Sequence, residues 1–535
     1  MNKQPTPIKA NELANLLKSQ EEFALLDIRE EGVYANNHLL FAISLPLSRL
    51  EERINALVPR KSTKIIIVGD DELIQPGIEA LQKYGYTHIS WLEGGNAAWA
   101  EAGFQLISGV NVPSKLFGEY VQDKCNTPSI DPLELKALID AGQDLIIVDS
   151  RPSEEFFNVS IPGAINCPGV ELIYRLPELL PSEKTMVVVN CAGRTRSIIG
   201  SQSLINFGIK NRVVALRNGT IGWHLSGLPL RHGEKSQVPP TPKDSLSQLE
   251  KRASDVRNRF KIKEIDRTAL EQFLRQSDEK TTYLLDIRSP QEYARGHLPD
   301  ALSAPGGQLV QATDQYVGTR NSRIVLIDHD GIRSTMTASW LMQMGLKEVY
   351  TYRAQTHELN ATSTPAFALP PEVPHDASAE ISAQELRQRL QDNNAHVVDL
   401  SSSLEFRNGH IPGAHFAIRS RLQKNLSQLP PTSLLVLTSS DASQAWRSLE
   451  AVKKIMTCPV KVLEGGNKAW SALGLPLSDG MEPALDLPED LWYRPTSPHG
   501  GGENAMRNYI SWEIDLFNRL FKEPGLEFPD LHGHN

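Results

Sequence analysis

The stretch LIIVDSRP, residues 145–152, sets the pattern from which the fold can be predicted. It is an apolar run that ends in an aspartate, and similar runs end at Asp27, Asp286 and Asp399. The four aspartates lie 122, 137 and 113 residues apart, which is the spacing of domains rather than of a solenoid repeat. The 535-residue chain is therefore predicted to contain four tandem copies of one unit.

Each copy continues in the same order after its aspartate. A turn reads IPGA at residues 161–164 and 411–414, and a second apolar run of the type MVVVN (residues 186–190) follows in every copy. Continuous apolar runs of this kind indicate strands buried on both faces of a parallel sheet, with helices as crossovers. Three copies end in a glycine turn and a helix with a tryptophan, at Trp99, Trp223 and Trp470. We therefore predict four α/β domains, each a small parallel sheet with helices on both faces.

The repeat and its joints divide the chain into six segments. We predict domain 1 over residues 1–110, domain 2 over 122–232, a linker and helix over 233–260, domain 3 over 261–370, domain 4 over 376–480, and a C-terminal helical tail over 481–535. The linker helix carries an apolar stripe that is expected to pack on a neighbour, made of Leu246, Leu249, Ala253, Val256 and Phe260. The tail has one periodic piece that is expected to cap a domain or contact a partner, with Ile510, Ile514, Phe517 and Phe521 on one face.

Composition restricts the class of protein. Hydrophobic residues make up 40% and charged residues 22% of the chain, which are ordinary values for a globular protein. The net charge of −9 argues against a broad nucleic-acid surface, and no apolar run approaches the roughly 18 residues of a membrane span. The first residues lack the apolar core of a secretory signal, and four cysteines cannot form a disulfide framework. A cytoplasmic protein without a metal site is expected.

The loop that follows residues 186–190 is the one stretch with the features of a reaction centre. It consists of Cys191, Ala192, Gly193, Arg194, Thr195 and Arg196 and leads into a helix. A thiol at the carboxyl end of a parallel strand lies where α/β proteins place their active sites. The loop N–H groups, the helix N-terminus and the two arginines would each favour an anionic sulfur. We therefore predict that Cys191 has a lowered pKa and is a reactive thiolate.

The Asp-ended strands, the IPGA turn, the glycine–tryptophan element and this loop together resemble the rhodanese family of sulfurtransferases over residues 8–478. The resemblance implies that Cys191 takes the outer sulfur of a donor, holds it as a persulfide and passes it to cyanide, a thiol or a protein. It further implies that Arg194 and Arg196 bind an anionic donor such as thiosulfate, and that the amides of residues 192–196 cradle the persulfide. No cofactor is implied.

Three alternatives remain open from the residues alone. The donor could be 3-mercaptopyruvate or a low-molecular-weight persulfide. The chain could instead be a binding scaffold, because most of its copies lack a thiol. Phosphatase chemistry is disfavoured, because the related phosphatase loop has five residues between cysteine and arginine, whereas here Arg196 follows Cys191 after four and Ser197 stands at the phosphatase position.

The other copies are predicted to be inactive. Alignment on their second apolar runs places Asp70, Asp328 and Ser439 at the position of Cys191. A carboxylate would repel an anionic donor, and a hydroxyl is too weakly acidic to carry a sulfane sulfur. By resemblance, domain 1 is expected to form a wall of the Cys191 pocket, while domains 3 and 4 pair separately.

Several other residues are interpreted as structural. Asp149 and Arg151 belong to an Asp-x-Arg pair that recurs in copies without a thiol, which favours a role in orienting loops. The remaining cysteines are interpreted as small core residues, namely Cys125, Cys167 and Cys458.

Overall fold

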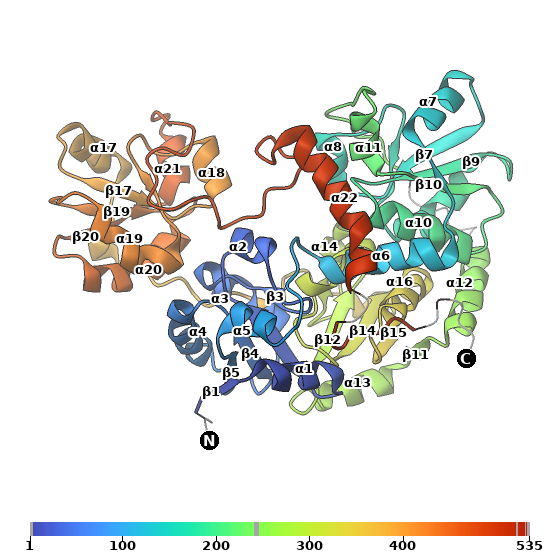
Figure 1. Cartoon of the computed structure of the whole chain (residues 1–535), viewed down its shortest axis with the longest axis horizontal. Helices are drawn as coiled ribbons and strands as arrows, with labels where there is room; N and C mark the ends of the chain where they lie inside the picture. The colour runs from blue at the N-terminus through green and yellow to red at the C-terminus, as the bar shows by residue number, and fades with distance from the viewer. Residues whose placement is uncertain (1–3, 240–245, 521–522, 530, 532–535) are drawn as a thin grey trace.

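The computed structural model describes residues 4–239, 246–520, 523–529 and 531. Its strands form four five-stranded sheets in which neighbouring strands run parallel (Figure 1). Each sheet has the same order: its first strand lies at one edge, followed by its fifth, fourth, second and third strands. The predicted four-domain α/β fold with a C-terminal helix is confirmed.

Domain 1 shows how each unit is built. Its strands are β1 (Thr6–Ile8), β2 (Phe23–Asp27), β3 (Ile43–Ser44), β4 (Lys64–Val68) and β5 (His88–Leu92). Its helices are α1 (Ala10–Lys18), α2 (Glu31–Asn36), α3 (Leu50–Leu57), α4 (Asp71–Lys83) and α5 (Gly95–Glu101). Alternate side chains of β2 and β4 point to opposite faces, so that one set packs with α3 and α4 and the other with α1, α2 and α5. Both faces of the sheet are therefore buried.

Domains 2 and 3 repeat this arrangement. Domain 2 contains β6 (Ser129–Ile130), β7 (Leu145–Asp149), β8 (Ile165–Asn166), β9 (Met186–Asn190) and β10 (Val213–Leu216), with α7 (Pro132–Asp140), α8 (Ser153–Asn158), α9 (Glu171–Arg175), α10 (Thr195–Asn206) and α11 (Gly219–Leu225). It is preceded by α6 (Val112–Cys125). Domain 3 contains β11 (Lys263–Ile265), β12 (Thr282–Asp286), β13 (Leu302–Ser303), β14 (Arg323–Asp328) and β15 (Val349–Arg353), with α13 (Arg267–Arg275), α14 (Pro290–Arg295), α15 (Gly306–Gln311) and α16 (Ile332–Gln343).

The linker helix and domain 4 complete the repeat. The linker helix is α12 (Leu246–Phe260), which buries Leu249, Ala253, Val256 and Phe260 and packs against α16, so its prediction is confirmed. Part of the predicted linker, residues 240–245, lies outside the described residues. Domain 4 contains β16 (Glu380–Ile381), β17 (His396–Asp399), β18 (His415–Phe416), β19 (Leu435–Thr438) and β20 (Val460–Leu463), with α17 (Ala383–Gln391), α18 (Ser403–Asn408), α19 (Leu422–Asn425), α20 (Ser443–Ile455) and α21 (Gly466–Ala472).

The tail helix is α22 (Gly502–Leu520). The face through which it packs on the protein differs in part from the apolar stripe predicted from the sequence. Ile510 is buried and Phe517 is half-buried, but Ile514 is 44% exposed, and Phe521 lies outside the described residues. Glu513 is instead buried on the inner face. The predicted stripe is therefore right for Ile510 and Phe517 and wrong for Ile514, because Glu513 takes the inner position next to it.

The recurring Asp-x-Arg pair fastens a loop in three domains. Arg151 donates from Nε and Nη2 to Asp149, at 2.9 and 2.8 Å, and from Nη2 to the carbonyl of Val159 at 2.6 Å. Equivalent forks join Arg29 to Asp27 and Arg288 to Asp286. Because the same contacts occur in each domain, the pair belongs to the scaffold, as predicted.

Domains 2 and 3 share one continuous hydrophobic core. Arg333 of domain 3 has a fully buried side chain and binds Glu171 of domain 2 and Glu292 of its own domain, both at 2.8 Å. The indole N–H of Trp340 donates to the hydroxyl of Ser203 at 2.8 Å. Domain 3, rather than domain 1, is therefore the partner of the domain that carries Cys191.

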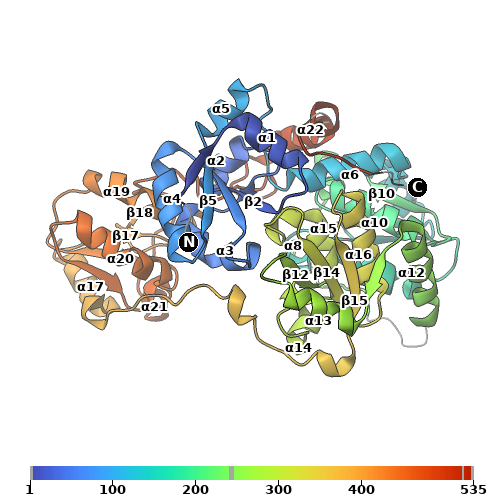
Figure 2. The ribbon, with the colours of Figure 1, turned by 90° about the horizontal axis from the view of Figure 1, so that it is seen from below.

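Domain 1 lies between domains 3 and 4, and domain 4 is beside domain 1 in both views (Figures 1 and 2). Toward domain 3, the Tyr283 hydroxyl donates to the carbonyl of Leu57. Toward domain 4, Arg419 binds Glu51 at 2.7 Å. The expected pairing of domain 1 with domain 2, and of domain 3 with domain 4, is wrong, since these contacts link 2 to 3, 3 to 1 and 1 to 4.

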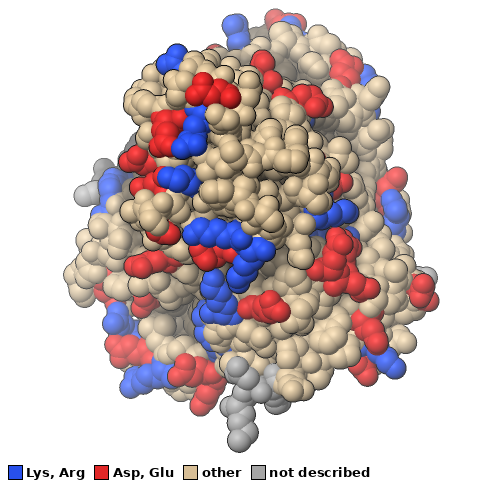
Figure 3. Space-filling view, turned by 90° about the vertical axis from the view of Figure 1, so that its left-hand side faces the viewer, with Lys and Arg blue, Asp and Glu red and all other residues tan. Residues whose placement is uncertain are grey.

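The side of the molecule seen in Figure 3 carries lysines and arginines interspersed with acidic side chains, without a broad field of one sign. Across the part of the chain that is described, no helix combines the length and apolar character needed to cross a bilayer. The same residues contain no group of three or more His, Cys, Asp or Glu side chains placed to hold a metal ion.

Candidate active site

Cys191 directly follows β9, a central strand of the domain 2 sheet. The end of the strand is held by Asn190, whose amide donates to Asp149 at 2.7 Å and to the Thr220 hydroxyl at 3.1 Å. The chain then forms a short loop and enters α10 at Thr195. The thiol thus lies beside a helix N-terminus, where N–H groups favour negative charge.

A second helix N-terminus fixes the path of the loop. The carbonyl of Cys191 accepts the N–H of Thr220 at 2.8 Å, and the carbonyl of Ala192 accepts the N–H of Ile221 at 3.0 Å. Gly219 makes this approach possible, because it has a φ of +54° and a Cβ there would lie 2.3 Å from the carbonyl oxygen of Cys191. The glycine turn before α11 therefore supports the loop that carries Cys191.

The sulfur lies in a buried environment. Cys191 is 1% exposed, and its Sγ donates to the Ser197 hydroxyl at 3.4 Å. Burial raises the pKa of Cys191; the charge of Arg196 and hydrogen bonds from Ser197 oppose this rise, and the Glu513 carboxylate adds to it. The predicted lowering of the thiol pKa is therefore wrong for this arrangement, because desolvation outweighs the favourable loop contacts.

Both arginines of the loop are already paired with carboxylates. Arg194 binds Glu119 of α6 through Nε at 2.6 Å and Nη2 at 2.7 Å. Arg196 binds Glu155 of α8 through Nη1 at 3.0 Å and Nη2 at 2.9 Å. Their charges lie near the thiol as predicted, but each guanidinium is oriented by an acid that sequence reasoning did not identify.

Helix α22 packs against α6 beside domain 2 (Figure 1). The Thr195 hydroxyl donates to Glu513 at 3.3 Å. A Cβ on Gly193 would lie 3.0 Å from the Glu513 carboxylate and 3.4 Å from the ring of Tyr509. The tail thus contacts the loop that carries the thiol, and Cys191 is 1% exposed beneath it.

A buried lysine lies on the other side of Glu513. The Nζ of Lys115 is 5.4, 5.0 and 4.9 Å from the ring centroids of Trp492, Tyr509 and Trp512, respectively. Burial lowers the pKa of Lys115 to about 8, against the opposing charge of Glu513. Sequence reasoning missed Lys115 and Glu513, because they come from segments outside the repeat; the one available signal was a carboxylate beside the apolar stripe of α22.

Strand register locates the equivalents of Cys191 in the other domains. Asn190 pairs with Asp149, just as Ile327 pairs with Asp286 and Thr438 with Asp399. The next residues, Asp328 and Ser439, therefore occupy the position of Cys191. In domain 1 the pair is Asp27 and Val68, so the equivalent residue is Gly69, and the prediction of Asp70 is wrong by one position.

The domain 3 loop is filled by its own carboxylate. Asp328 accepts the N–H groups of Gly331 and Ser334, both at 2.9 Å, and the Ser334 hydroxyl at 3.0 Å. The loop amides that would cradle a persulfide in domain 2 are thus directed to a side chain in domain 3.

A central parallel sheet with a cysteine loop at its carboxyl edge defines the class of α/β protein to which this chain belongs. The sequence matches the family model described as "Rhodanese-like domain" at residues 9–102, 131–226, 269–357 and 382–473. The chain is a member of the rhodanese-like family, with four copies of its domain.

Similar proteins include one solved structure of the same extent. A thiosulfate sulfurtransferase from Pseudomonas aeruginosa is 40% identical, with a TM-score of 0.92, and the match covers 98% of this chain and 100% of that one. A sulfurtransferase from Allochromatium vinosum is 34% identical over 17% of this chain and 82% of its own length. An HTH-type transcriptional regulator from Mycobacterium tuberculosis is 35% identical over 20% of this chain, and the match spans 45% of that protein.

Proposed function

We propose that the chain is a sulfurtransferase that carries a sulfane sulfur on Cys191, with thiosulfate as the donor. The observation that carries this proposal is the position of Cys191 between a central strand and the N-terminus of α10, with Ser197 and Arg196 stabilising its thiolate. The similarity to a thiosulfate sulfurtransferase supports the choice of donor.

The transfer proceeds in two displacements on sulfur. The Cys191 thiolate attacks the outer sulfur of thiosulfate, the S–S bond of the donor breaks, and sulfite leaves with the bonding electron pair. The acceptor, a thiol, a protein thiol or cyanide, then attacks the terminal sulfur of the persulfide. The Cys191 thiolate leaves and is regenerated, so that no cofactor is required.

The loop residues have distinct roles in this scheme. The amides of residues 192–196, including those of Ala192, Gly193 and Thr195, stabilise the terminal sulfur, since they belong to the loop between Cys191 and the start of α10. Arg196 and Arg194 attract the sulfite end of the donor while Glu155 and Glu119 keep their side chains oriented. Domains 1, 3 and 4 lack a thiol at the equivalent position and serve as inactive partners.

Intact-mass spectrometry after thiosulfate treatment tests the proposal. The native protein is expected to gain the mass of one sulfur atom, which cyanide then removes as thiocyanate. Cys191→Ser should not gain this mass. Cys167→Ser is the matched control, because Cys167 is also a buried thiol of domain 2, with a pKa raised by burial; it should load as the native protein does.

Other outcomes of this experiment would support a different donor or a function without sulfur transfer. Loading by 3-mercaptopyruvate or glutathione persulfide, but not by thiosulfate, would retain the persulfide and change the donor. No adduct with any of them would favour a binding scaffold. None of the four cysteines, all of them among the described residues, forms a disulfide, which suits a reducing compartment such as the cytoplasm.

A further inference from the structure

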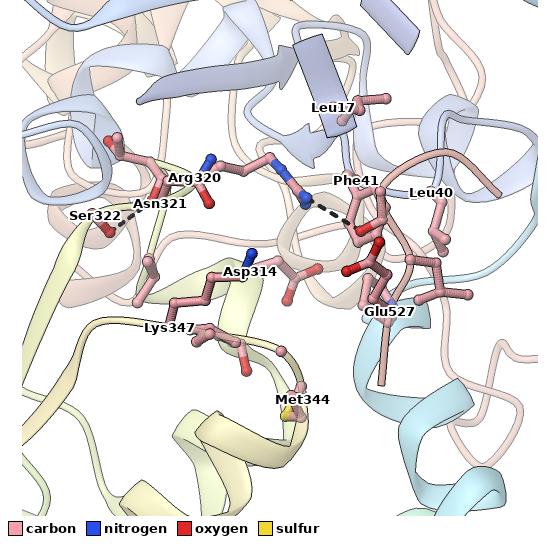
Figure 4. Close-up of a pocket in the computed structure, with 18 of the residues that line it drawn as sticks. Leu17, Leu40, Phe41, Asp314, Arg320, Asn321, Ser322, Met344, Lys347 and Glu527 are labelled. Carbon is pink, nitrogen blue, oxygen red and sulfur yellow. Dashed lines mark hydrogen bonds between the residues drawn. The ribbon is translucent and has the colours of Figure 1, made fainter. Parts of the chain in front are cut away.

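A cavity lies away from the Cys191 loop, where domain 1, domain 3 and the tail meet (Figure 4). Its volume is about 200 Å³, and none of its lining residues belongs to the loop of residues 191–196. Domain 1 contributes Leu17 and Phe41, domain 3 contributes Asp314 and Arg320, and the tail contributes Phe528. The transfer reaction assigns no role to this space.

Arg320 is an unusual arginine in this molecule. Its guanidinium lies 4.0 Å from the ring centroid of Phe41, and its Nη2 reaches the carbonyl of Gly525 only at 3.5 Å. Its Nε is buried without a hydrogen-bond partner, and none of the described carboxylates lies within ion-pair distance. Burial alone lowers the pKa of Arg320 to about 10. By contrast, the buried side chains of Arg151 and Arg333 are paired with acids.

Asp314, an acid with a carboxylate oxygen that lacks a hydrogen-bond partner, lines the same cavity. The Oδ1 atom of Asp314 is buried without a hydrogen-bond partner. Burial raises the pKa of Asp314 to about 6, although the charges of Arg53 and Lys115 oppose the rise. The hydroxyl of Thr319 is also buried and without a partner. Unpaired buried groups of this kind are costly unless a ligand or water completes them.

The rest of the wall is largely apolar. It is formed by Leu17, Leu40, Phe41, Ile324, Met344, Leu346 and Phe528. The remaining charged residues, Lys18, Lys347 and Glu527, are exposed. The cavity therefore combines a half-buried cation, a half-buried acid and an apolar wall, and its volume suits a molecule of about the size of an amino acid.

We propose that this cavity binds a free α-amino acid with an apolar side chain. Its carboxylate binds the guanidinium of Arg320, its ammonium group binds Asp314, and its side chain packs among the apolar residues. A zwitterion satisfies both unpaired groups together, whereas a simple anion would leave Asp314 unpaired and a simple amine would leave Arg320 unpaired.

Isothermal titration calorimetry on the full chain tests this with three probes of nearly the same shape. L-leucine carries both charged groups, isocaproate lacks the ammonium group, and isoamylamine lacks the carboxylate. L-leucine is expected to bind, and each truncated probe should bind at least about tenfold more weakly, because each loses a charge-assisted hydrogen bond. The readout is binding alone, so it does not depend on sulfur transfer.

Three variants locate the site. Arg320→Gln should weaken L-leucine binding at least about tenfold. Asp314→Asn should remove the preference for L-leucine over isocaproate while still binding isocaproate, which also shows that this variant is folded. Arg323→Gln is the matched control, because Arg323 also lies over a phenylalanine, 3.8 Å from the ring centroid of Phe273, but does not line the cavity; it should bind L-leucine as the native protein does.

The proposal is overturned by any of three results. The first is the absence of binding by L-leucine, L-methionine and L-phenylalanine alike. The second is equal affinity of the native protein for L-leucine and isocaproate. The third is undiminished L-leucine binding by Arg320→Gln.

Discussion

Glu513 is the residue through which the tail acts on the thiol. It is buried, it accepts a hydrogen bond from Thr195, and its charge raises the pKa of Cys191. Lys115 is the cation that opposes Glu513, but its pKa is lowered to about 8. At alkaline pH Lys115 loses its proton, and Arg194 is then the cation that still opposes the charge of Glu513.

We therefore expect Glu513→Gln to lower the pKa of Cys191. The amide keeps the shape of the side chain and removes the negative charge that disfavours the thiolate. The rate of alkylation by iodoacetamide, measured against pH and followed by mass at Cys191, should have its midpoint at a lower pH than in the native protein. Glu503→Gln provides the control, because Glu503 is exposed on the same helix and pairs with Arg507. An unchanged or higher midpoint in Glu513→Gln would contradict the assigned role.

At this scale the sequence indicated the reactive loop but not its neighbours. Cys191, Arg194 and Arg196 lie within one short segment of the chain, so a local sequence motif reveals them. Their partners come from distant segments: Glu119 lies 75 residues from Arg194. Because burial and ion pairing by such groups set the thiol pKa, its direction could not be read from the loop alone.

The turn before α11 is the element that supports the loop most directly. A methyl group on Gly219 would meet the Cys191 carbonyl at 2.3 Å, while a methyl group on Gly227 would meet nothing within 4 Å. Both glycines have positive φ, at +54° and +75°, so alanine is strained at either position. Only Gly219 adds a collision with the active-site loop.

Gly219→Ala should therefore displace the loop, whereas Gly227→Ala should only destabilise the protein, by about 1 kcal/mol. We expect slower persulfide formation from thiosulfate in Gly219→Ala, together with a larger fall in melting temperature. Persulfide formation in Gly227→Ala should match that of the native protein. Measuring both by intact mass and calorimetry separates the two effects, and equal loading rates in the two variants would refute the supporting role of the turn.

Whole elements were the most predictable part of the molecule. The strands ending at Asp27, Asp149, Asp286 and Asp399 were visible because strands buried on both faces are continuous apolar runs. The residue of domain 1 that corresponds to Cys191 could not be identified from the sequence. A glycine follows β4, so no side chain marks the equivalent position. The inner face of α22 was also mispredicted, because an apolar stripe cannot show that a carboxylate is buried beside it.

The arrangement of the whole molecule depends on contacts between domains, and Arg333 is central to them. Its side chain is fully buried between Glu171 and Glu292, and its guanidinium lies 4.3 Å from the ring centroid of Tyr174. We expect domains 2 and 3, which share one core, to unfold together.

Arg333→Met should destabilise this pair by about 3–5 kcal/mol, because it removes the buried cation that the buried Glu171 and the half-buried Glu292 share, although Glu171 keeps Arg175 as a partner. Differential scanning calorimetry should show the transition of domains 2 and 3 at a lower temperature. Arg389→Met removes an exposed pair with Glu385 in domain 4 and should change stability by less than about 1 kcal/mol. A similar effect of the two substitutions would count against a central role for Arg333.

The pairing of domains could not be predicted from the repeat. All four copies share the same internal pattern, so that pattern does not distinguish which copies touch. The contacts that decide which domains pair are made by residues such as Glu171, Arg333 and Trp340. In the sequence these residues are ordinary polar or aromatic residues, because nothing local shows their partners.

The cover over Cys191 also has a consequence for the order of events during translation. Thr195 and Glu513, which meet above the thiol, are separated by 318 residues. A ribosome adds about 5–20 residues per second, so the loop is synthesised tens of seconds before the helix that closes it. Throughout that interval the nascent chain carries the Cys191 loop without its cover, open to electrophiles and oxidants, and the synthesis of α22 is the event that shelters it.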